Sequence, residues 1–262
     1  MSSENYILIL GATGNIGGKI AQELILKNAM IGVAGRSRQK LATFAGKAEL
    51  LEGDFNEDAF LQQAFFKATS LFLTVPDDAL ATPAVTAQRL INLIQSSPIR
   101  HVVNISNCIT EKYGQPTRLV AFEQELNKMG SINLLHLRCA NFFENLHWGL
   151  HTPYKPDLAL PYISSYEVAS VAATYLLNRD FSGNSVKELM GPRDYTMAEL
   201  AAAAGEEYVQ LPYTDNNRHF YKGFNDGDFK VTPRTASNTS PLSENRFTLE
   251  YFLTHDFVQS VN

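Results

Sequence analysis

The stretch Leu10–Gly18, LGATGNIGG, decides the fold, because it follows the apolar run Tyr6–Ile9 and precedes residues with apolar side chains at helical spacing. Its glycines, at positions 11, 14 and 17, suit a tight turn after a strand, a close approach of the backbone to a pyrophosphate, and close packing of the next helix. The amino end of such a helix presents unpaired N–H groups and a favourable dipole to phosphates. We therefore predict a strand–loop–helix unit that binds a dinucleotide. The alternative is a glycine-rich turn without a ligand.

Apolar strands alternate with amphipathic helices over the first part of the chain, as far as Arg138. Strands are expected over 6–10, 30–35, 48–54, 70–75, 101–106 and 132–138, and helices over 15–28, 38–45, 57–67, 83–95 and 118–129. This alternation predicts an α/β fold, a doubly wound parallel sheet of the Rossmann type with helices on both faces.

The chain changes character after Arg138, where aromatic residues and prolines become frequent. Helices are predicted over 165–178 and 196–205, a strand over 185–191, and mostly irregular structure over 212–245. We expect residues 1–150 to form the nucleotide-binding core, to which the helix near 165–178 returns. Residues 151–262 are expected to form a smaller lobe that is not an independent domain.

Composition argues against several functional classes. The 262 residues carry a net charge of −5, which leaves no broad basic field for nucleic acid or an anionic membrane. No apolar stretch reaches the roughly 20 residues that cross a bilayer, and we expect no signal peptide. The cysteines, Cys108 and Cys139, suit a reducing cytoplasm, and a pair of small buried thiols is favoured over a redox-sensing pair. We expect a cytoplasmic protein without a metal site.

The residues after the second predicted strand distinguish the two nicotinamide dinucleotides. Enzymes that prefer NAD place Asp or Glu there to hold the ribose 2′-hydroxyl. This chain has Arg36, Ser37 and Arg38, and a guanidinium matches a 2′-phosphate. One charge-assisted contact contributes about 1.5–3 kcal/mol, or roughly 10- to 100-fold in affinity. We therefore predict NADP(H) in preference to NAD(H), the alternative being that both arginines are solvated residues at the start of a helix.

The remaining cofactor candidates follow the third and fourth predicted strands. Asp54 is expected to face the adenine edge and Thr74–Pro76 the ribose, although Asp and Pro are equally typical of turns. The complete predicted set comprises Gly11, Thr13, Gly14, Asn15, Ile16, Gly17, Arg36, Ser37, Arg38, Asp54, Thr74, Val75 and Pro76.

Several motifs together resemble the NmrA-like group of atypical short-chain dehydrogenases/reductases, over residues 6 to about 205. They are GATGNIG, GRS, EGD, FEQELNKMGSINLLHLRCANFFENL and ELMGPRDYTMAELA. The resemblance implies a Rossmann core, a small lobe closing over it and a dinucleotide between them. It does not imply a single function. Members similar to quinone reductases transfer hydride from NADPH, members similar to a fungal regulator sense the dinucleotide and act through partner proteins, and members similar to phenylpropanoid reductases use a helical lysine.

Typical members of the wider superfamily use a Tyr-x-x-x-Lys pair, in which lysine lowers the pKa of the tyrosine for proton exchange. No tyrosine here has a lysine four residues later, and Thr117 stands at that place after Tyr113. Ala121 and Glu123 occupy places from which a helical lysine could project. Alcohol–ketone chemistry is therefore disfavoured, and epimerisation or dehydration of nucleotide sugars ranks last.

A quinone accepts hydride without a dedicated acid, and needs mainly a flat apolar pocket over the nicotinamide. Phe142, Phe143 and Trp148 are the predicted pocket, with ordinary packing as the alternative, and Tyr113, His147 and Asn107 are candidate orienting groups or proton donors. His147 by itself is more typical of a structural role. We predict an NADPH-dependent reductase of a small-molecule acceptor such as a quinone. The alternative is a non-catalytic NAD(P) sensor with a regulatory protein partner, and a homodimer fits either function.

Overall fold

The structure is a computed structural model that describes residues 5–257, and it divides into two compact units. The first unit comprises the chain up to Ser106 together with 118–138 and 168–187. The second comprises 107–117, 139–167 and the chain from Glu188 onward. Residues 107–117 and 139–150, which we expected in the nucleotide-binding core, thus lie in the second unit.

The first unit is built on a seven-stranded sheet in the order β11-β8-β5-β4-β1-β2-β3. The strands are β1 (Tyr6–Ile9), β2 (Met30–Gly35), β3 (Glu49–Glu52), β4 (Ser70–Leu73), β5 (His101–Asn107), β8 (Asn133–Cys139) and β11 (Asn184–Leu189). Pairing is parallel, and Leu8 of β1 lies between Gly32 of β2 and Leu71 of β4. The strand order reverses between β1 and β4, which creates the crevice at which doubly wound proteins bind ligands. The predicted fold class is confirmed.

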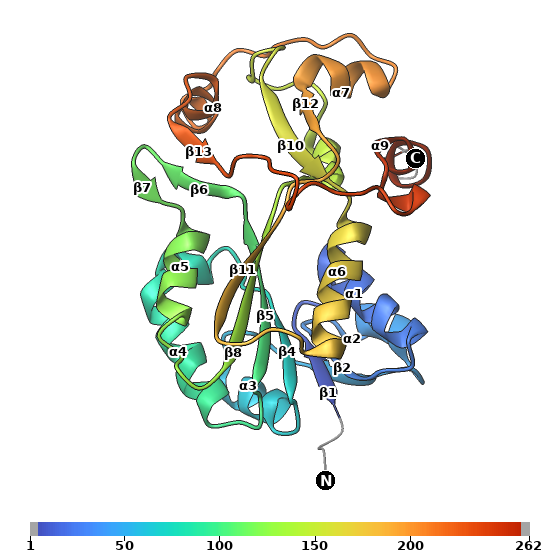
Figure 1. Ribbon diagram of the computed structural model, residues 1–262, viewed down its shortest axis with the longest axis vertical. Helices are drawn as coiled ribbons and strands as arrows, with labels where there is room; N and C mark the ends of the chain where they lie inside the picture. The colour runs from blue at the N-terminus through green and yellow to red at the C-terminus, as the bar shows by residue number, and fades with distance from the viewer. Residues whose placement is uncertain (1–4, 258–262) are drawn as a thin grey trace. The chain divides into compact units, whose positions relative to one another are not determined.

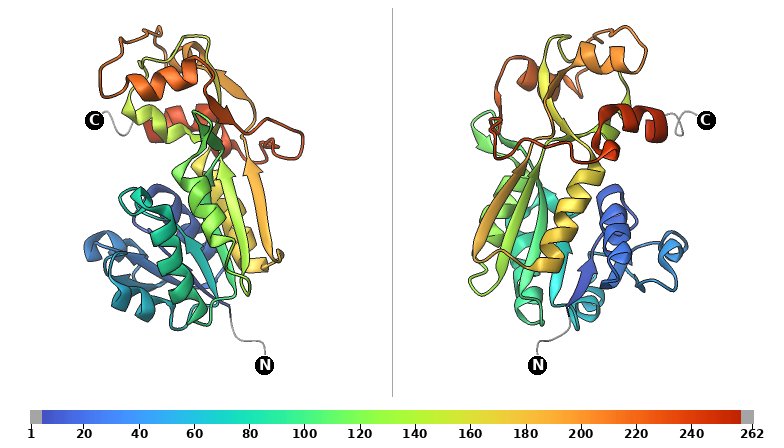
Figure 2. Two further views of the ribbon diagram at one scale, coloured as in Figure 1. Left: turned by 90° about the vertical axis from the view of Figure 1, so that its left-hand side faces the viewer. Right: turned by 45° about the vertical axis from the view of Figure 1, so that its right-hand side comes forward.

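Helices cover both faces of this sheet. They are α1 (Asn15–Leu26), α2 (Arg38–Leu41) with its extension η1 (Ala42–Phe44), α3 (Asp58–Phe65), η2 (Ala79–Ala81), α4 (Pro83–Gln95), α5 (Arg118–Leu126) and α6 (Ser165–Asn178). Figures 1 and 2 show α3, α4 and α5 over one face and α1, α2 and α6 over the other. Strands that are buried on both faces are expected to be apolar throughout, and all four residues of β4 are buried.

The second unit contains two small sheets and several short helices. One sheet is formed by β9 (Asn141–Phe142), β10 (Ala159–Ile163) and β12 (Asp194–Thr196), and the other by β6 (Ile109–Lys112), β7 (Gln115–Pro116) and β13 (Phe229–Val231). The helices are η3 (Phe143–Trp148), α7 (Met197–Ala203), α8 (Arg218–Asn225), η4 (Asn245–Phe247), α9 (Leu249–Tyr251) and the π-helix η5 (Phe252–Phe257). The predicted start of α7 is confirmed, because Thr196 and Glu199 form a reciprocal capping box.

Residues 212–245 are mostly irregular, as predicted, but α8 and β13 lie in this segment and were not predicted. Phe220 and Phe224 are four residues apart and share one face of α8, with ring centroids 5.3 Å from each other. Phe224 packs edge-on against Phe229 of β13, at 4.8 Å, and Phe229 is the pairing partner of Lys112 in β6. The aromatic face of the helix stabilises this part of the chain, and the surrounding polar residues concealed it in the sequence.

A buried histidine in β8 makes the stability of the fold sensitive to acid. His136 is 1% exposed, and its ring nitrogens lie 3.0 Å from Asn104 Nδ2 and 3.1 Å from Asn127 Oδ1. Burial lowers the pKa of His136 to about 4. The unfolded chain, in which this pKa is about 6.5, therefore binds more protons between pH 6.5 and pH 4. Stability is present above that window and is lost as the pH falls through it.

We expect the free energy of unfolding to fall by about 2 kcal/mol between pH 7 and pH 5 through His136. Denaturant titrations of the wild type and His136→Gln at both pH values measure this contribution as the difference between the two pH slopes. Equal slopes in the two proteins would show that His136 does not couple folding to protonation.

Candidate dinucleotide site

Four strand ends of the first unit surround a cavity of about 290 Å³. The strands are β1, β2, β3 and β4, and the cavity lies at the carboxyl edge of the sheet where the strand order reverses. Of the residues predicted to bind a cofactor, the cavity is lined by Gly11, Thr13, Gly14, Arg36, Asp54, Thr74, Val75 and Pro76. Loops that are distant in the sequence therefore meet at one place.

The loop after β1 requires glycine at two positions. Gly11 has φ +66°, in the left-handed region, and a Cβ there would lie 2.6 Å from Thr74 Cγ2. A Cβ on Gly17 would lie 2.4 Å from the carbonyl oxygen of Gly11. Ala12 N–H donates to Ala34 O at 3.0 Å, which ties the loop to the end of β2. The backbone around the loop is consequently held close to the cavity, as binding of a pyrophosphate requires.

Helix α1 begins at this loop with its amino end available to an anion. Gly14 precedes the helix in an extended conformation, with φ −95° and ψ 175°. Within residues 5–257 no side chain caps this end, and the first turn carries no acidic residue. The first N–H groups of a helix lack intrahelical acceptors, and the helix dipole adds positive potential there. Asn15, Ile16 and Gly17 form the first turn and do not line the cavity.

The three residues predicted to bind the 2′-phosphate lie in the turn from β2 to α2, and their side chains make different contacts. Arg36 is exposed and lines the cavity, and within residues 5–257 its guanidinium has no hydrogen-bond or ion-pair partner. Ser37 caps α2, accepting from Lys40 N–H at 3.3 Å. Arg38 donates from Nη1 to Leu50 O at 3.1 Å, and its N–H donates to a carboxylate oxygen of Glu52, also at 3.1 Å. Arg36 is thus the arginine at the cavity, and Ser37 and Arg38 contact the local backbone.

The loop after β3 forms an apolar wall of the cavity. Phe55 and Phe60 line it, and Gly53 lets Phe60 pack against the backbone, because a Cβ on Gly53 would lie 2.2 Å from Phe60 Cδ2. Asp54 Oδ1 accepts from Asn56 N–H at 2.8 Å, so that Asp54 both shapes a turn and lines the cavity. Sequence reasoning missed the lining residues Leu10, Ala34, Gly35, Gly53, Phe55, Asn56, Phe60, Leu61 and Asp78. For most of them the available signal was a position at or just after the end of a strand, whereas Phe60 and Leu61 lie within α3.

The predicted substrate-pocket residues lie in the second unit. Phe143 is 1% exposed and stacks on Tyr162, at a centroid distance of 6.3 Å, and on Phe252, at 6.0 Å. Phe142 is half-buried in β9, whereas Trp148 is 86% exposed. Phe143 therefore packs in the interior of this unit.

The three predicted orienting groups also lie in the second unit and contact local structure. Tyr113 has φ 51° at the turn between β6 and β7, stacks on His219 at 4.2 Å, and donates from its hydroxyl to His219 O at 2.6 Å. Asn107 Oδ1 accepts from Ile109 N–H at 2.6 Å. His147 stacks on Phe257 at 5.5 Å. A catalytic role for Tyr113, Asn107 or His147 stays a prediction.

The two cysteines are buried free thiols on adjacent strand ends. Cys108 N–H donates to Cys139 O at 2.9 Å, so that the two residues are neighbours. Burial raises the pKa of the Cys108 thiol to about 12 and the pKa of the Cys139 thiol well above its usual value. Both are protonated at neutral pH, which favours small buried thiols over a reactive pair.

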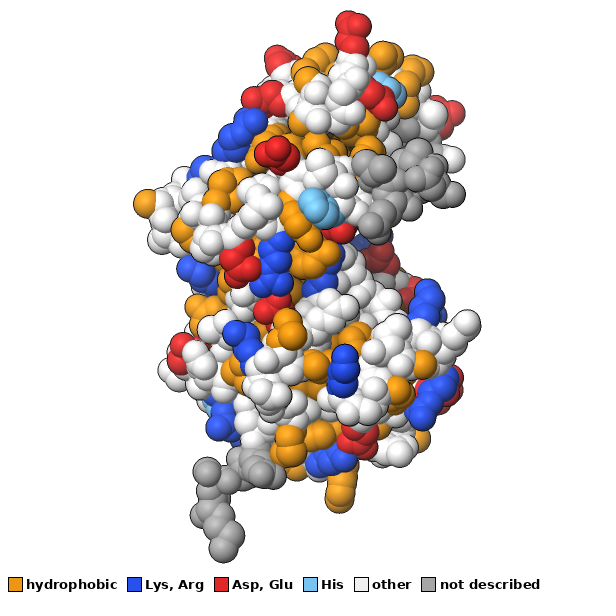
Figure 3. Space-filling view, turned by 90° about the vertical axis from the view of Figure 1, so that its right-hand side faces the viewer, with side chains coloured by type: hydrophobic (Ala, Val, Ile, Leu, Met, Phe, Trp, Pro, Cys, Tyr) orange, Lys and Arg blue, Asp and Glu red, His pale blue; other side chains and the backbone are white. Residues whose placement is uncertain are grey.

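On the face drawn in Figure 3, basic and acidic side chains are interspersed. Within residues 5–257 no helix combines the length and the apolar character that crossing a membrane requires.

Comparisons with known proteins concern the family and the fold. Residues 3–127 match the model of the NmrA-like family, as the motifs predicted, and no curated protein matches the sequence significantly. The NADPH-dependent quinone oxidoreductase of Escherichia coli, complexed with NADPH, is 19% identical, with a TM-score of 0.78 over 96% of this chain and 99% of that chain.

Two further structures share the fold. NmrA, a negative transcriptional regulator complexed with NAD, is 14% identical, with a TM-score of 0.77 over 99% of this chain and 97% of that chain. Triphenylmethane reductase of Citrobacter sp., complexed with NADP(H), is 20% identical, with a TM-score of 0.73 over 88% of this chain and 93% of that chain. The chain thus has the fold of nicotinamide-dinucleotide-binding proteins that include both reductases and a regulator.

Proposed function

We propose that this chain, whose residues 3–127 belong to the NmrA-like family, is an NADPH-dependent reductase that transfers hydride to a small electrophilic acceptor such as a quinone. The observation that carries the proposal is Arg36, an exposed guanidinium at the wall of the cavity at the end of β2, where NAD-preferring proteins carry a carboxylate. The buried, protonated thiols of Cys108 and Cys139 suit a reducing compartment, and we propose that the protein is cytoplasmic.

The cavity residues fit the adenosine and phosphate parts of the dinucleotide. The backbone of the Gly11–Gly14 loop and the amino end of α1 would bind the pyrophosphate, and Arg36 would bind the 2′-phosphate. Asp54 and Phe55 would contact the adenine, and Thr74–Pro76 the ribose. When bound, the reduced nicotinamide supplies the hydride.

The chain's own residues would orient the acceptor and exclude water. Phe142 and Trp148 remain the proposed apolar surface for a flat acceptor, whereas Phe143 is buried in the second unit and cannot present its ring. Tyr113, His147 and Asn107 remain the proposed orienting groups. The Tyr113 hydroxyl already donates to His219 O. A reduced quinone can take its proton from water, so that the mechanism does not depend on a Tyr-x-x-x-Lys pair.

The preference for NADPH is expected to depend on Arg36. In Arg36→Ala, the Kd for NADPH should rise about 10- to 100-fold, because one charge-assisted contact is lost, and the Kd for NADH should stay within about twofold. Calorimetric titration of both dinucleotides measures this. Arg38→Ala is the matched control, since Arg38 contacts Leu50 O instead of the cavity. A loss of NADPH affinity in Arg38→Ala without a loss in Arg36→Ala would show that Arg38, and not Arg36, binds the 2′-phosphate.

Turnover tests the reductase proposal directly. NADPH oxidation is followed by absorbance with a panel of quinones and triphenylmethane dyes, and quinone-dependent oxidation is expected. Tight NADPH binding without oxidation by any acceptor would contradict catalysis.

That second outcome would support a non-catalytic NAD(P) sensor that acts through a protein partner. Two observations favour this candidate: the sequence has no Tyr-x-x-x-Lys pair, and the fold is shared with a transcriptional regulator complexed with NAD. A sensor is expected to bind a partner protein in a manner that depends on the bound dinucleotide.

A further inference from the structure

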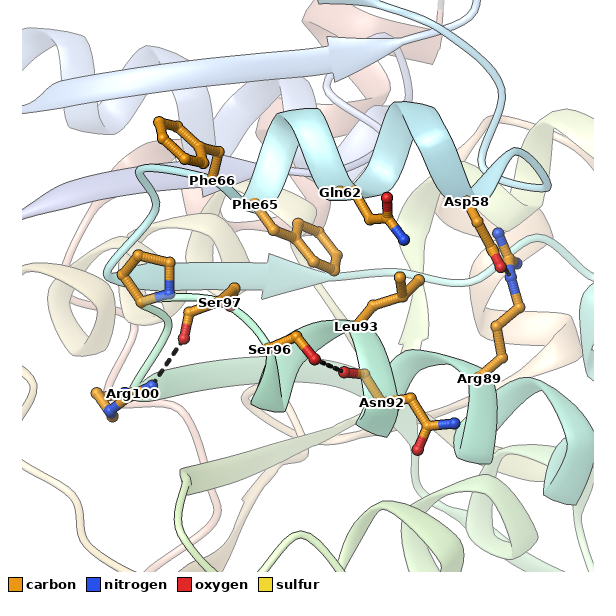
Figure 4. A pocket seen from close by; sticks show the side chains of 11 residues that line it. Asp58, Gln62, Phe65, Phe66, Arg89, Asn92, Leu93, Ser96, Ser97 and Arg100 are labelled. Carbon is orange, nitrogen blue, oxygen red and sulfur yellow. Dashed lines mark hydrogen bonds and ion pairs between the residues drawn. The ribbon is translucent and has the colours of Figure 1, made fainter.

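A second and larger hollow of the first unit, about 1050 Å³, lies between α3 and α4 (Figure 4). Asp58 of α3 and Arg89 of α4 line one end of it, and Arg100 lines the other. Nothing in the structure identifies an occupant of this groove. At one end of the groove, Arg89 also contacts Phe55 in the wall of the dinucleotide cavity.

Arg89 makes two contacts with Phe55 in the loop after β3 and one with Asp58 at the start of α3. Its Nε donates to Asp58 Oδ1 at 2.5 Å, and its Nη2 donates to the carbonyl oxygen of Phe55 at 2.7 Å. The guanidinium also lies over the Phe55 ring, 5.4 Å from its centroid. The Arg89 side chain is only 22% exposed, so that solvent screens these contacts incompletely. Together they hold the Phe55 backbone and side chain and the start of α3.

The same loop lines the dinucleotide cavity. Phe55 is one of the lining residues, together with its neighbours Asp54 and Asn56. The turn is closed internally by Asn56 N–H donating to Asp54 Oδ1 and by Glu57 N–H donating to Asp54 O. Those bonds shape the turn, whereas Arg89 attaches it to α4. Arg89 itself does not line the cavity, so that it acts on a ligand through the residues that it contacts, Phe55 and Asp58.

We propose that Arg89 is a positioning residue of the dinucleotide site, which holds the Phe55 loop in the conformation that receives the adenosine half of the ligand. This inference rests on the proposed function. Without Arg89 the loop gains other conformations, so that only a fraction of the molecules can bind the ligand. The apparent Kd then rises in inverse proportion to that fraction. The effect is confined to ligands that contain adenosine, because Phe55 belongs to that end of the cavity.

The matched variants are Arg89→Ala and Arg100→Ala. Arg100 lines the same groove, but its Nη1 donates to Ser97 O and Ile99 O, on the turn before β5. The probes are NADPH and adenosine 2′,5′-bisphosphate, which lacks the nicotinamide half. Both dissociation constants are measured by calorimetry. In Arg89→Ala we expect both to rise by the same factor, about tenfold, and in Arg100→Ala both should stay within about twofold.

Arg89→Lys provides a variant that retains the positive charge. Lysine can pair with Asp58 but cannot also donate to Phe55 O with a planar fork, and we expect an intermediate loss of affinity for both probes. In turnover with a quinone, the KM for NADPH should rise in Arg89→Ala while kcat at saturating NADPH is retained. A merely structural defect would not produce this graded and selective pattern.

Unchanged dissociation constants in Arg89→Ala and Arg89→Lys, or equal losses in Arg89→Ala and Arg100→Ala, would overturn the positioning role. If the wild type binds both probes in that case, the proposed dinucleotide site survives and only this inference fails. A wild type that binds neither probe would overturn the site and the inference together.

Discussion

Replacing Gly191 by alanine is expected to lower the free energy of unfolding by about 3 kcal/mol or more, because the added methyl group meets backbone. Gly191 follows β11 with φ +69°, in the left-handed region. A Cβ there would lie 1.8 Å from the carbonyl oxygen of Tyr162 and 3.1 Å from Ile163 Cα. No rotamer relieves a contact between backbone and Cβ, so β10 and the Gly191 turn must move apart.

That movement disturbs further bonds of the second unit. Gly191 O accepts from Ser240 N–H at 3.0 Å and from Arg234 Nη1 at 2.7 Å. Gly183→Ala is the matched control, since Gly183 has φ +60° and, among the described residues beyond its chain neighbours, no atom would lie within 4 Å of the added methyl group. Its cost is about 1–2 kcal/mol, from the left-handed conformation alone. Urea unfolding of both variants measures the difference, and equal losses would contradict the role of the Tyr162 contact.

Removing the carboxylate of Glu123 is expected to destabilise the first unit by about 3–5 kcal/mol. Glu123 lies on α5, is 2% exposed, and pairs with Arg138 of β8. Arg138 Nη2 donates to Glu123 Oε2 at 2.6 Å, and its Nε lies 3.2 Å from Oε1 and 3.1 Å from Oε2. Glu123→Ala removes the buried counter-charge of the guanidinium, and such losses are much larger than the net contribution of an intact pair.

Glu125→Ala on the same helix is the control for Glu123→Ala. Glu125 pairs with Lys128 at an exposed (i, i+3) site, at 2.5 Å, and pairs of this kind contribute about 0–1 kcal/mol. Denaturant unfolding curves of the two variants measure the contrast. If both lose less than about 1 kcal/mol, burial does not make the Glu123–Arg138 pair important for stability.

Elements with a local signature were predicted from the sequence. The apolar run MIGVAG gave the bounds of β2, and the helical spacing of apolar residues gave those of α4. The small sheets of the second unit were not predicted, because their strands are stabilised by partners distant in the sequence. Phe229 of β13 pairs with Lys112, for example, and Ala159 of β10 pairs with Thr196. Short strands of this kind carry too few residues for a periodic pattern.

The candidate site also contains residues with a local sequence signature and residues whose position depends on distant parts of the chain. The glycines of the loop after β1 carry a sequence signature, since only glycine fits at Gly11 and Gly17. The different placement of Arg36 and Arg38 depends on how β2 pairs with β3, where Gly35 lies opposite Glu52. Sequence alone contains no such information. Phe55 was missed for a similar reason, because a single aromatic residue in a loop has no pattern.

Titration of the wild type with NADPH and with NADH, in the same buffer and at the same salt concentration, tests the central claim most directly. Arg36 at the cavity predicts a Kd for NADPH at least about tenfold below that for NADH, with the difference shrinking as salt screens the 2′-phosphate. Equal affinities, tighter binding of NADH, or binding of neither dinucleotide would contradict an NADP(H) site at these four strand ends.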